Sequence, residues 1–189
     1  MSNCASLASG ITLNCSTIIT SGAEEEIVLF NYDDIDRDSS TITGTQISVL
    51  ALAGSPAPLG YLLEGTNNSV RPAYTQTKES QGNPFKFTHN IPFRIFNKTA
   101  AINDILQDLA GGLFTAFVFT RNQLVEVYGF RVGLEAVINQ DAYENDGLII
   151  VTLQTPADQF ETKVPLIYTG AASPVASFDT LKAEIIALT

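Results

Sequence analysis

His89 is the first residue to test for catalysis, because it is the only histidine of the 189-residue chain. A Ser-His-Asp or Cys-His arrangement would have to use it, and the sequence contains no G-x-S-x-G nucleophile motif. His89 also falls on the apolar parity of the segment 85–96, in which apolar and polar residues alternate. We therefore interpret His89 as a hydrogen-bonded residue of the core, and we predict that the chain has no catalytic residues and is not an enzyme.

Asp34, Asp36 and Asp38 could begin a calcium-binding loop, because they alternate as the first ligands of an EF-hand do. An EF-hand that began at Asp34 would need Gly at the position of Ser39 and Glu at the position of Thr45, and neither is present. We interpret the three carboxylates as part of a solvated acidic loop. A loose cation site and a subunit contact are the alternatives.

A second acidic cluster consists of Asp141, Glu144 and Asp146. Two carboxylates can act as acid and base when a cleft raises the pKa of one of them. Asp146 precedes Gly147, and an Asp-Gly pair favours the tip of a β-hairpin. We therefore expect these carboxylates to be solvated on a turn.

Cys4 and Cys15 do not have the spacing of a metal site, because ten residues separate them and no histidine lies near. We interpret them as ordinary small residues, with a disulfide as the main alternative. The G-x-x-x-x-G-K-[ST], G-x-G-x-x-G and H-E-x-x-H motifs are absent. The sequence thus predicts no metal site and no cofactor.

The chain is acidic, with ten Lys and Arg, twenty Asp and Glu, and a formal net charge of −10. Its basic residues are scattered, which argues against binding to nucleic-acid phosphates or to anionic membranes. Charged residues make up only 16% of the chain, and such a chain often buries further surface by assembly. No apolar run is long enough to span a bilayer, and Met1–Thr20 lacks the basic start of a secretory signal.

The residue pattern divides the chain into an N-terminal arm (1–23), a β-rich domain (24–170) and a C-terminal segment (171–189). Polar stretches predict loops at 33–44 and, at unusual length, at 64–84. Alternating or continuous apolar runs predict strands at 27–32, 45–53, 85–96, 113–120, 124–137, 148–155 and 162–168. We expect 113–120 to be covered on both faces, because it is apolar on both parities. The strand at 124–137 should bend at Gly129 or Gly133.

Residues 98–110 predict an amphipathic helix between two strands. Its apolar residues recur at three- and four-residue spacing: Ala101, Ile102, Ile105, Leu106 and Leu109. Asn97 is the expected cap at its start, and Gly111-Gly112 should end it. An aspartate at Ile105 should then block folding, since it would bury a charge. Residues 178–188 favour a second helix slightly over an extended segment.

These elements predict a mainly β, α+β fold, either a β-sandwich or a partly closed barrel with one packed amphipathic helix. Residues 85–154 have the order strand, capped helix, doubly buried strand and long hairpin, and they begin with FKFTHNIPFRIFNKTAAINDILQDLAGGLFTAFVFT. This stretch resembles the tail-tube proteins of tailed bacteriophages and their relatives in contractile injection machines. The opening CASLASGITLNCSTIITSGAEEEIVLFNYDDID resembles virion proteins of phages that infect Bacteroidetes.

The resemblance implies a tail-tube-like sandwich whose sheet joins neighbouring copies into a ring, hexameric or higher, in the tail of a virion. DNA would pass through the ring during ejection without specific binding, and the acidic charge agrees with such a channel. Residues 1–23 and 64–84 would be inter-subunit arms, and other virion tail or portal-proximal proteins would be the partners, with no membrane involved. The family offers no catalytic residues. The alternatives are a capsid decoration or head–tail joining protein and a non-viral binding module, with an enzyme last.

Overall fold

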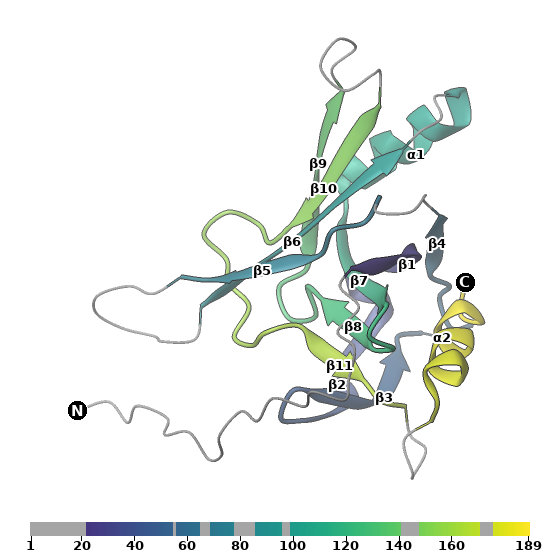
Figure 1. The fold of residues 1–189 in the computed structure, drawn as a ribbon, viewed down its shortest axis with the longest axis vertical. Helices are drawn as coiled ribbons and strands as arrows, with labels where there is room; N and C mark the ends of the chain where they lie inside the picture. Colours follow the sequence, from purple (N-terminus) through teal and green to yellow (C-terminus); the bar gives the residue numbers. More distant parts are fainter. Residues whose placement is uncertain are drawn as a thin grey trace.

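The structure is a computed structural model, which describes residues 22–54, 56–64, 69–77, 86–95, 99–140, 148–170 and 176–189. Within these ranges the chain is mainly β, with two α-helices beside the sheet (Figure 1). The sheet is open and does not close into a barrel. The predicted β-rich α+β class is confirmed, and so is the preference for a helix in the C-terminal segment.

The strands are β1 (Ala23–Asn31), β2 (Ile35–Thr43), β3 (Gln46–Leu52), β4 (Tyr61–Glu64), β5 (Ala73–Gln76), β6 (Phe87–Ile95), β7 (Leu113–Thr120), β8 (Val125–Tyr128), β9 (Leu134–Gln140), β10 (Ile149–Gln154) and β11 (Leu166–Tyr168). The helices are the short 3-10 turn η1 (Tyr32–Asp34) and the α-helices α1 (Ala100–Gly111) and α2 (Phe178–Ile186).

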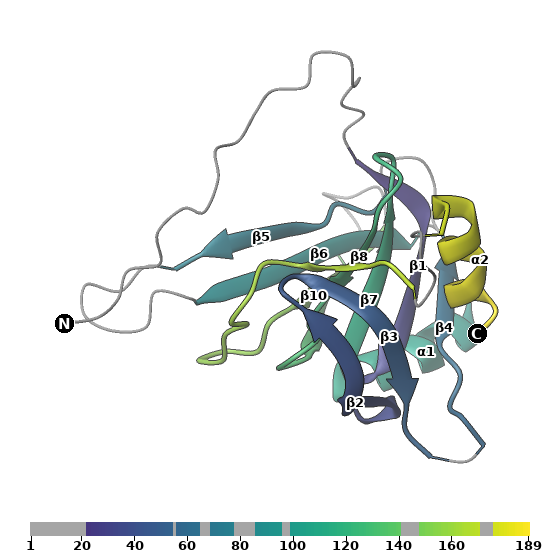
Figure 2. The same cartoon turned by 90° about the horizontal axis from the view of Figure 1, so that it is seen from below.

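The sheet divides at β7. One edge of this strand pairs with β1, while the other edge pairs with β8 along Ala116–Phe119 and with β9 at Leu113 and Phe114. One branch then runs from β8 through β11 and β3 to β2, and the other runs from β9 through β10 and β6 to β5. Figures 1 and 2 show the two branches diverging from this centre. Because β8 and β9 are consecutive in the chain, the turn between them carries the chain from one branch to the other.

The central strands β1 and β7 separate two hydrophobic cores. Their side chains alternate between the two faces, as strand geometry requires. The first core takes Ile27, Leu29, Ala116 and Val118 from these strands, and the second takes Val28, Phe30, Phe117 and Phe119. Residues of α1 complete the first core and residues of α2 complete the second. The prediction that 113–120 is covered on both faces is confirmed for Phe114–Thr120, all of which are buried.

Helix α1 differs from the expected helix at its start and in the width of its buried face. Thr99 caps it, because the Thr99 hydroxyl accepts a hydrogen bond from the Ile102 N–H at 3.2 Å. The expected cap, Asn97, lies outside the described residues. Only Leu106 and Leu109 are buried, whereas Ile105 is 50% exposed. The expectation that Ile105 faces the core is therefore wrong, because the buried stripe is narrower than the apolar pattern.

Two of the predicted loops contain strands. Residues 35–43 form β2, an antiparallel partner of β3. Within 64–84, residues 73–76 form β5 and pair with β6, and Val70 forms a bridge to Phe93. The loop predictions are wrong there, because both strands lie at ends of the sheet and are held by backbone pairing more than by apolar side chains. Residues 65–68 and 78–85 lie outside the described part of the chain.

The strand predicted at 124–137 is two strands, β8 and β9, rather than one bent strand. Gly129 and Gly133 both have positive φ, of 66° and 78°, which breaks the strand between them. A Cβ on Gly129 would lie 2.4 Å from Leu134 Cγ, so the close packing there also requires glycine.

The two faces of α1 lead to a test of the helix assignment. We expect Leu109→Asp to lower the free energy of unfolding by roughly 3–5 kcal/mol, since it places a carboxylate in the first core. Ile105→Asp should change it by about 1 kcal/mol or less, because the side chain at 105 reaches solvent. Urea unfolding followed by circular dichroism measures both. Equal losses in the two variants would contradict this orientation of α1.

Candidate functional site

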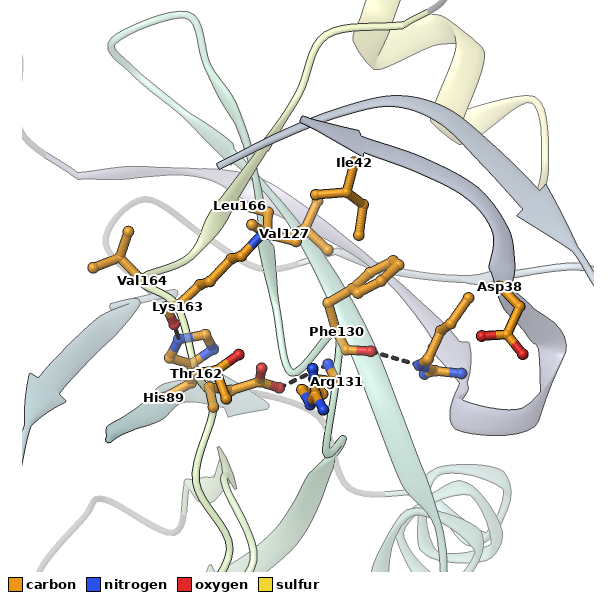
Figure 3. A pocket seen from close by; sticks show the side chains of 12 residues that line it. Asp38, Ile42, His89, Val127, Phe130, Arg131, Thr162, Lys163, Val164 and Leu166 are labelled. Atoms are coloured by element: carbon orange, nitrogen blue, oxygen red, sulfur yellow. Dashed lines mark hydrogen bonds between the residues drawn. The ribbon is translucent and has the colours of Figure 1, made fainter. Parts of the chain in front are cut away.

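A pocket of about 440 Å³ lies where β2, β6, β8 and the segment leading to β11 meet. Figure 3 shows its side chains converging around the turn between β8 and β9. Its charged lining residues are Arg37, Asp38, Arg131, Glu161 and Lys163, and His89 lies beside them. Within the described residues this is the pocket in which basic, acidic and imidazole groups meet, so we built the candidate site from it.

His89 lies in β6 and is buried in a fixed protonation state. Its Nδ1 accepts a hydrogen bond from the Gly129 N–H at 3.1 Å, which leaves the proton on Nε2, 3.3 Å from the carbonyl oxygen of Lys163. The ring also packs edge-on against Tyr128. Burial lowers the pKa of His89 to about 4, although the Lys163 carbonyl opposes this shift. The prediction that His89 is a hydrogen-bonded residue of the core is confirmed.

Glu161 is a buried carboxylate on the other side of the same turn. Its Oε1 accepts hydrogen bonds from the N–H groups of Arg131 and Val132, at 2.9 and 3.0 Å. The backbone of Glu161 is fixed by two hydrogen bonds of 2.9 Å with Phe87. Burial raises the pKa of Glu161, while these N–H groups and the charges of Arg131 and Arg37 act against the rise.

Arg37 of β2 reaches the turn from the other branch of the sheet. Its Nε donates to the carbonyl oxygen of Phe130 at 2.5 Å, and its Nη1 donates to the carbonyl oxygens of Tyr32 and Ile35 at 2.5 and 3.0 Å. The guanidinium also lies 3.5 Å from the centre of the Tyr32 ring, a cation–π contact. Its Nη2 donates to the hydroxyl oxygen of Thr115 at 3.2 Å, so each nitrogen of the guanidinium has a partner within the protein.

Two further carbonyl groups of the turn also accept hydrogen bonds. Thr115 donates its hydroxyl to the carbonyl oxygen of Gly129 at 3.2 Å, and the Tyr32 hydroxyl donates to the carbonyl oxygen of Arg131. Together, side chains from η1, β2, β6, β7 and the 155–165 segment hold residues 129–132. The pocket's buried polar groups therefore serve to fix the turn that joins the two branches of the sheet.

The first acidic cluster does not form a single site. Asp34 accepts a hydrogen bond from the Asn31 side chain at 2.7 Å. Asp36 accepts from the backbone N–H and the hydroxyl of Ser39, which lower the pKa of Asp36. Asp38 lines the pocket instead. The prediction of a loop is wrong for Asp36 and Asp38, since both lie in β2.

The other predicted residues lie outside the described ranges, namely Cys4, Cys15, Asp141, Glu144 and Asp146. Among the described residues, no three His, Cys, Asp or Glu side chains are grouped as a metal ion would require. In that same part of the chain, neither helix has the length and apolar character needed to cross a membrane.

Sequence reasoning did not identify Glu161 and Arg37. No motif marks either residue, because both act on backbone atoms far away in the chain. The only available signal was the pair Gly129 and Gly133, which indicated a bend and hence a turn that other groups would have to satisfy.

Comparisons of the chain with models of known protein families, with curated proteins and with solved structures found no match.

The buried neutral state of His89 predicts a pH dependence of stability. The unfolded state binds a proton near pH 6.5 and the folded state only near 4, so this group destabilises the fold as the pH falls between these values. Over that range the free energy of unfolding should fall by about 3 kcal/mol more in the wild type than in His89→Gln. Urea unfolding of both proteins between pH 7 and pH 4 measures the difference.

Glu161 acts in the opposite direction, because its raised pKa makes the fold less stable as the pH rises above the usual glutamate value of 4.5. The comparison between wild type and His89→Gln removes this contribution, since both proteins keep Glu161. Parallel pH curves would show that His89 is not buried in its neutral form.

The hydrogen bonds of Glu161 predict unequal effects of two substitutions. Glu161→Ala leaves the N–H groups of Arg131 and Val132 without their acceptor, which should cost about 2–5 kcal/mol of unfolding free energy. Glu161→Gln keeps an oxygen acceptor and should cost about 1 kcal/mol or less. Guanidinium unfolding at pH 7 gives both values, and a glutamine variant as unstable as the alanine variant would contradict the assigned role.

Proposed function

We propose that this chain is a structural virion protein that forms the oligomeric rings of a bacteriophage tail tube or tail, around a channel through which DNA passes during ejection. The proposal starts from the resemblance of residues 85–154 to tail-tube proteins. Three features of the described residues support it: the edges of the sheet, the use of the pocket's polar groups, and the engagement of basic side chains.

The observation that carries the proposal is the number of strands with a single partner. Within the described ranges, β2, β4 and β5 each pair with one strand only. The other edge of each of these strands has no partner strand among the described residues, and a strand of another chain can add at such an edge. An acidic protein of this size with several such edges is suited to assembly through its sheet.

The pocket supports a structural role because its buried polar groups hold the protein's own backbone. His89 and Glu161 both accept hydrogen bonds from the turn between β8 and β9. A catalytic base would need a free acceptor directed at a substrate, and His89 has both ring nitrogens engaged.

The charge distribution supports a channel that DNA passes without binding. Lys182 forms ion pairs with Glu24 and Glu26, at 2.5 and 2.7 Å. Lys163 donates to the carbonyl oxygen of Gly44 at 2.6 Å. These contacts bind the two lysine side chains to groups of the protein itself. The formal net charge of the chain is −10, and an acidic surface repels the phosphate backbone of DNA.

Solution mass and imaging test this function. At high protein concentration we expect light scattering to give a closed oligomer of about six copies or more, and negative-stain images to show rings with an axial channel. A chain that stays monomeric under these conditions is not a ring protein. In phage particles, labelling on the shell surface rather than along the tail would favour a capsid decoration protein instead.

A further inference from the structure

An apolar groove of about 520 Å³ runs between strand β4 and helix α1. Leu29 and Phe114 lie at its base, Tyr61 and Leu63 line it from β4, and Ile105 lines it from α1. The groove is separate from the pocket around His89, which has none of the same lining residues.

Large apolar side chains are exposed at this groove. Tyr61 is 55% exposed and Ile105 is 50% exposed, although both line it. Leu59 and Leu113, which adjoin lining residues in the chain, are also exposed. A group of exposed apolar residues around a concavity is typical of a surface that another molecule covers.

The wall of the groove is also a strand edge. β4 pairs with β1 from Tyr61 to Glu64, and in the described part of the chain it has no second partner strand. Just before β4, the Gly60 N–H donates to the carbonyl oxygen of Leu188 at 2.8 Å. Leu188 of the C-terminal segment therefore lies beside the chain at the start of β4. The groove thus combines apolar pockets with backbone groups that can bind an added strand.

The chain itself contains a segment with the pattern that such a site requires. In residues 11–19, ITLNCSTII, the apolar or small residues Ile11, Leu13 and Cys15 alternate with the polar residues Thr12 and Asn14. The alternation ends at Cys15, because Ser16 and Thr17 are both polar. This period-two alternation is typical of a strand with one buried face. We propose that the groove between β4 and α1 receives residues 11–19 of a second copy of this chain, added as a strand along the free edge of β4.

The charges of the groove and of the segment agree with this pairing. Asp108 lines the groove, and no Lys or Arg is among its lining residues. Residues 1–23 carry no charged side chain, in a chain with twenty Asp and Glu. The segment can therefore approach an acidic surface without the repulsion that most of this chain would meet.

The contacts of Gly22 and Ala23 fix where β1 begins. The carbonyl oxygen of Gly22 accepts from the Arg121 N–H at 3.0 Å, and Ala23 pairs with Thr120. These contacts hold the start of β1 against β7, whereas β4 pairs with the opposite edge of β1. We choose a second copy because the proposed ring requires contacts between copies, and disulfide trapping separates this from pairing within one molecule.

Disulfide trapping in the full chain tests the proposal, with Cys15 as the natural probe. In a Cys4→Ser background, we expect Ile105→Cys or Tyr61→Cys to form a disulfide with Cys15 of another copy under mild oxidation by diamide. Val137→Cys, which is exposed on β9, is the control and should cross-link at least tenfold less. A cross-link within one molecule, or none at either groove position, overturns the proposal.

A second measurement does not depend on cysteine geometry. Ile105→Asp should keep the thermal unfolding midpoint and weaken self-association at least tenfold, as measured by analytical ultracentrifugation. Val137→Asp, with a similar exposed fraction on β9, should leave association unchanged. Equal association of both variants and the wild type would also overturn the proposal.

This inference rests on the proposed function insofar as it requires copies that assemble, and the two can fail separately. Rings without the cross-link would remove the groove assignment and leave the ring function intact. Cross-linked dimers or chains without rings would keep the groove assignment and remove the ring function. A monomer without the cross-link would remove both.

Discussion

The fold depends on satisfying the backbone of one turn, residues 129–133, at which the chain leaves one branch of the sheet and enters the other. A buried peptide group without a hydrogen bond costs more than most single contacts provide. Here a carboxylate, an imidazole and a guanidinium supply the missing partners, from Glu161, His89 and Arg37. These three groups resemble a catalytic set in composition, but each of them forms hydrogen bonds with the backbone of the turn.

The elements that the sequence predicted most accurately are those whose own pattern of apolar and polar residues reflects their burial. Strand β7 is apolar on both parities because both of its faces are covered, and α1 has the spacing of a helix with one buried face. Strands β2 and β5 could not be predicted in this way. Their side chains are mostly polar and only Ile35 among them is buried, so their pairing depends on the backbone of β3 and β6 rather than on their own pattern. The division of 124–137 into two strands was visible only as a pair of glycines.

For the candidate site, the alternation of β6 was enough to place His89 in the core. Glu161 and Arg37 could not be predicted, since their partners are backbone atoms of the turn, 30 and 93 residues away in the chain. A backbone N–H is the same in every residue type, so composition and spacing give no sign of which carboxylate it will meet. Ile105 shows the same limit for helices, because periodicity gives the apolar face but not the fraction of it that the neighbouring strands cover.

The central pair β1 and β7 has a further consequence, because it is shared by two cores that have separate covers. Detachment of α2 would expose only the second core, and detachment of α1 would expose only the first, because each helix contributes residues to one core alone. The middle of β7 is buried on both faces, so we expect its amide hydrogens to exchange with solvent only when the whole molecule opens. Amide hydrogens near either helix should exchange through partial opening. The protein can therefore loosen on one side while its centre stays folded.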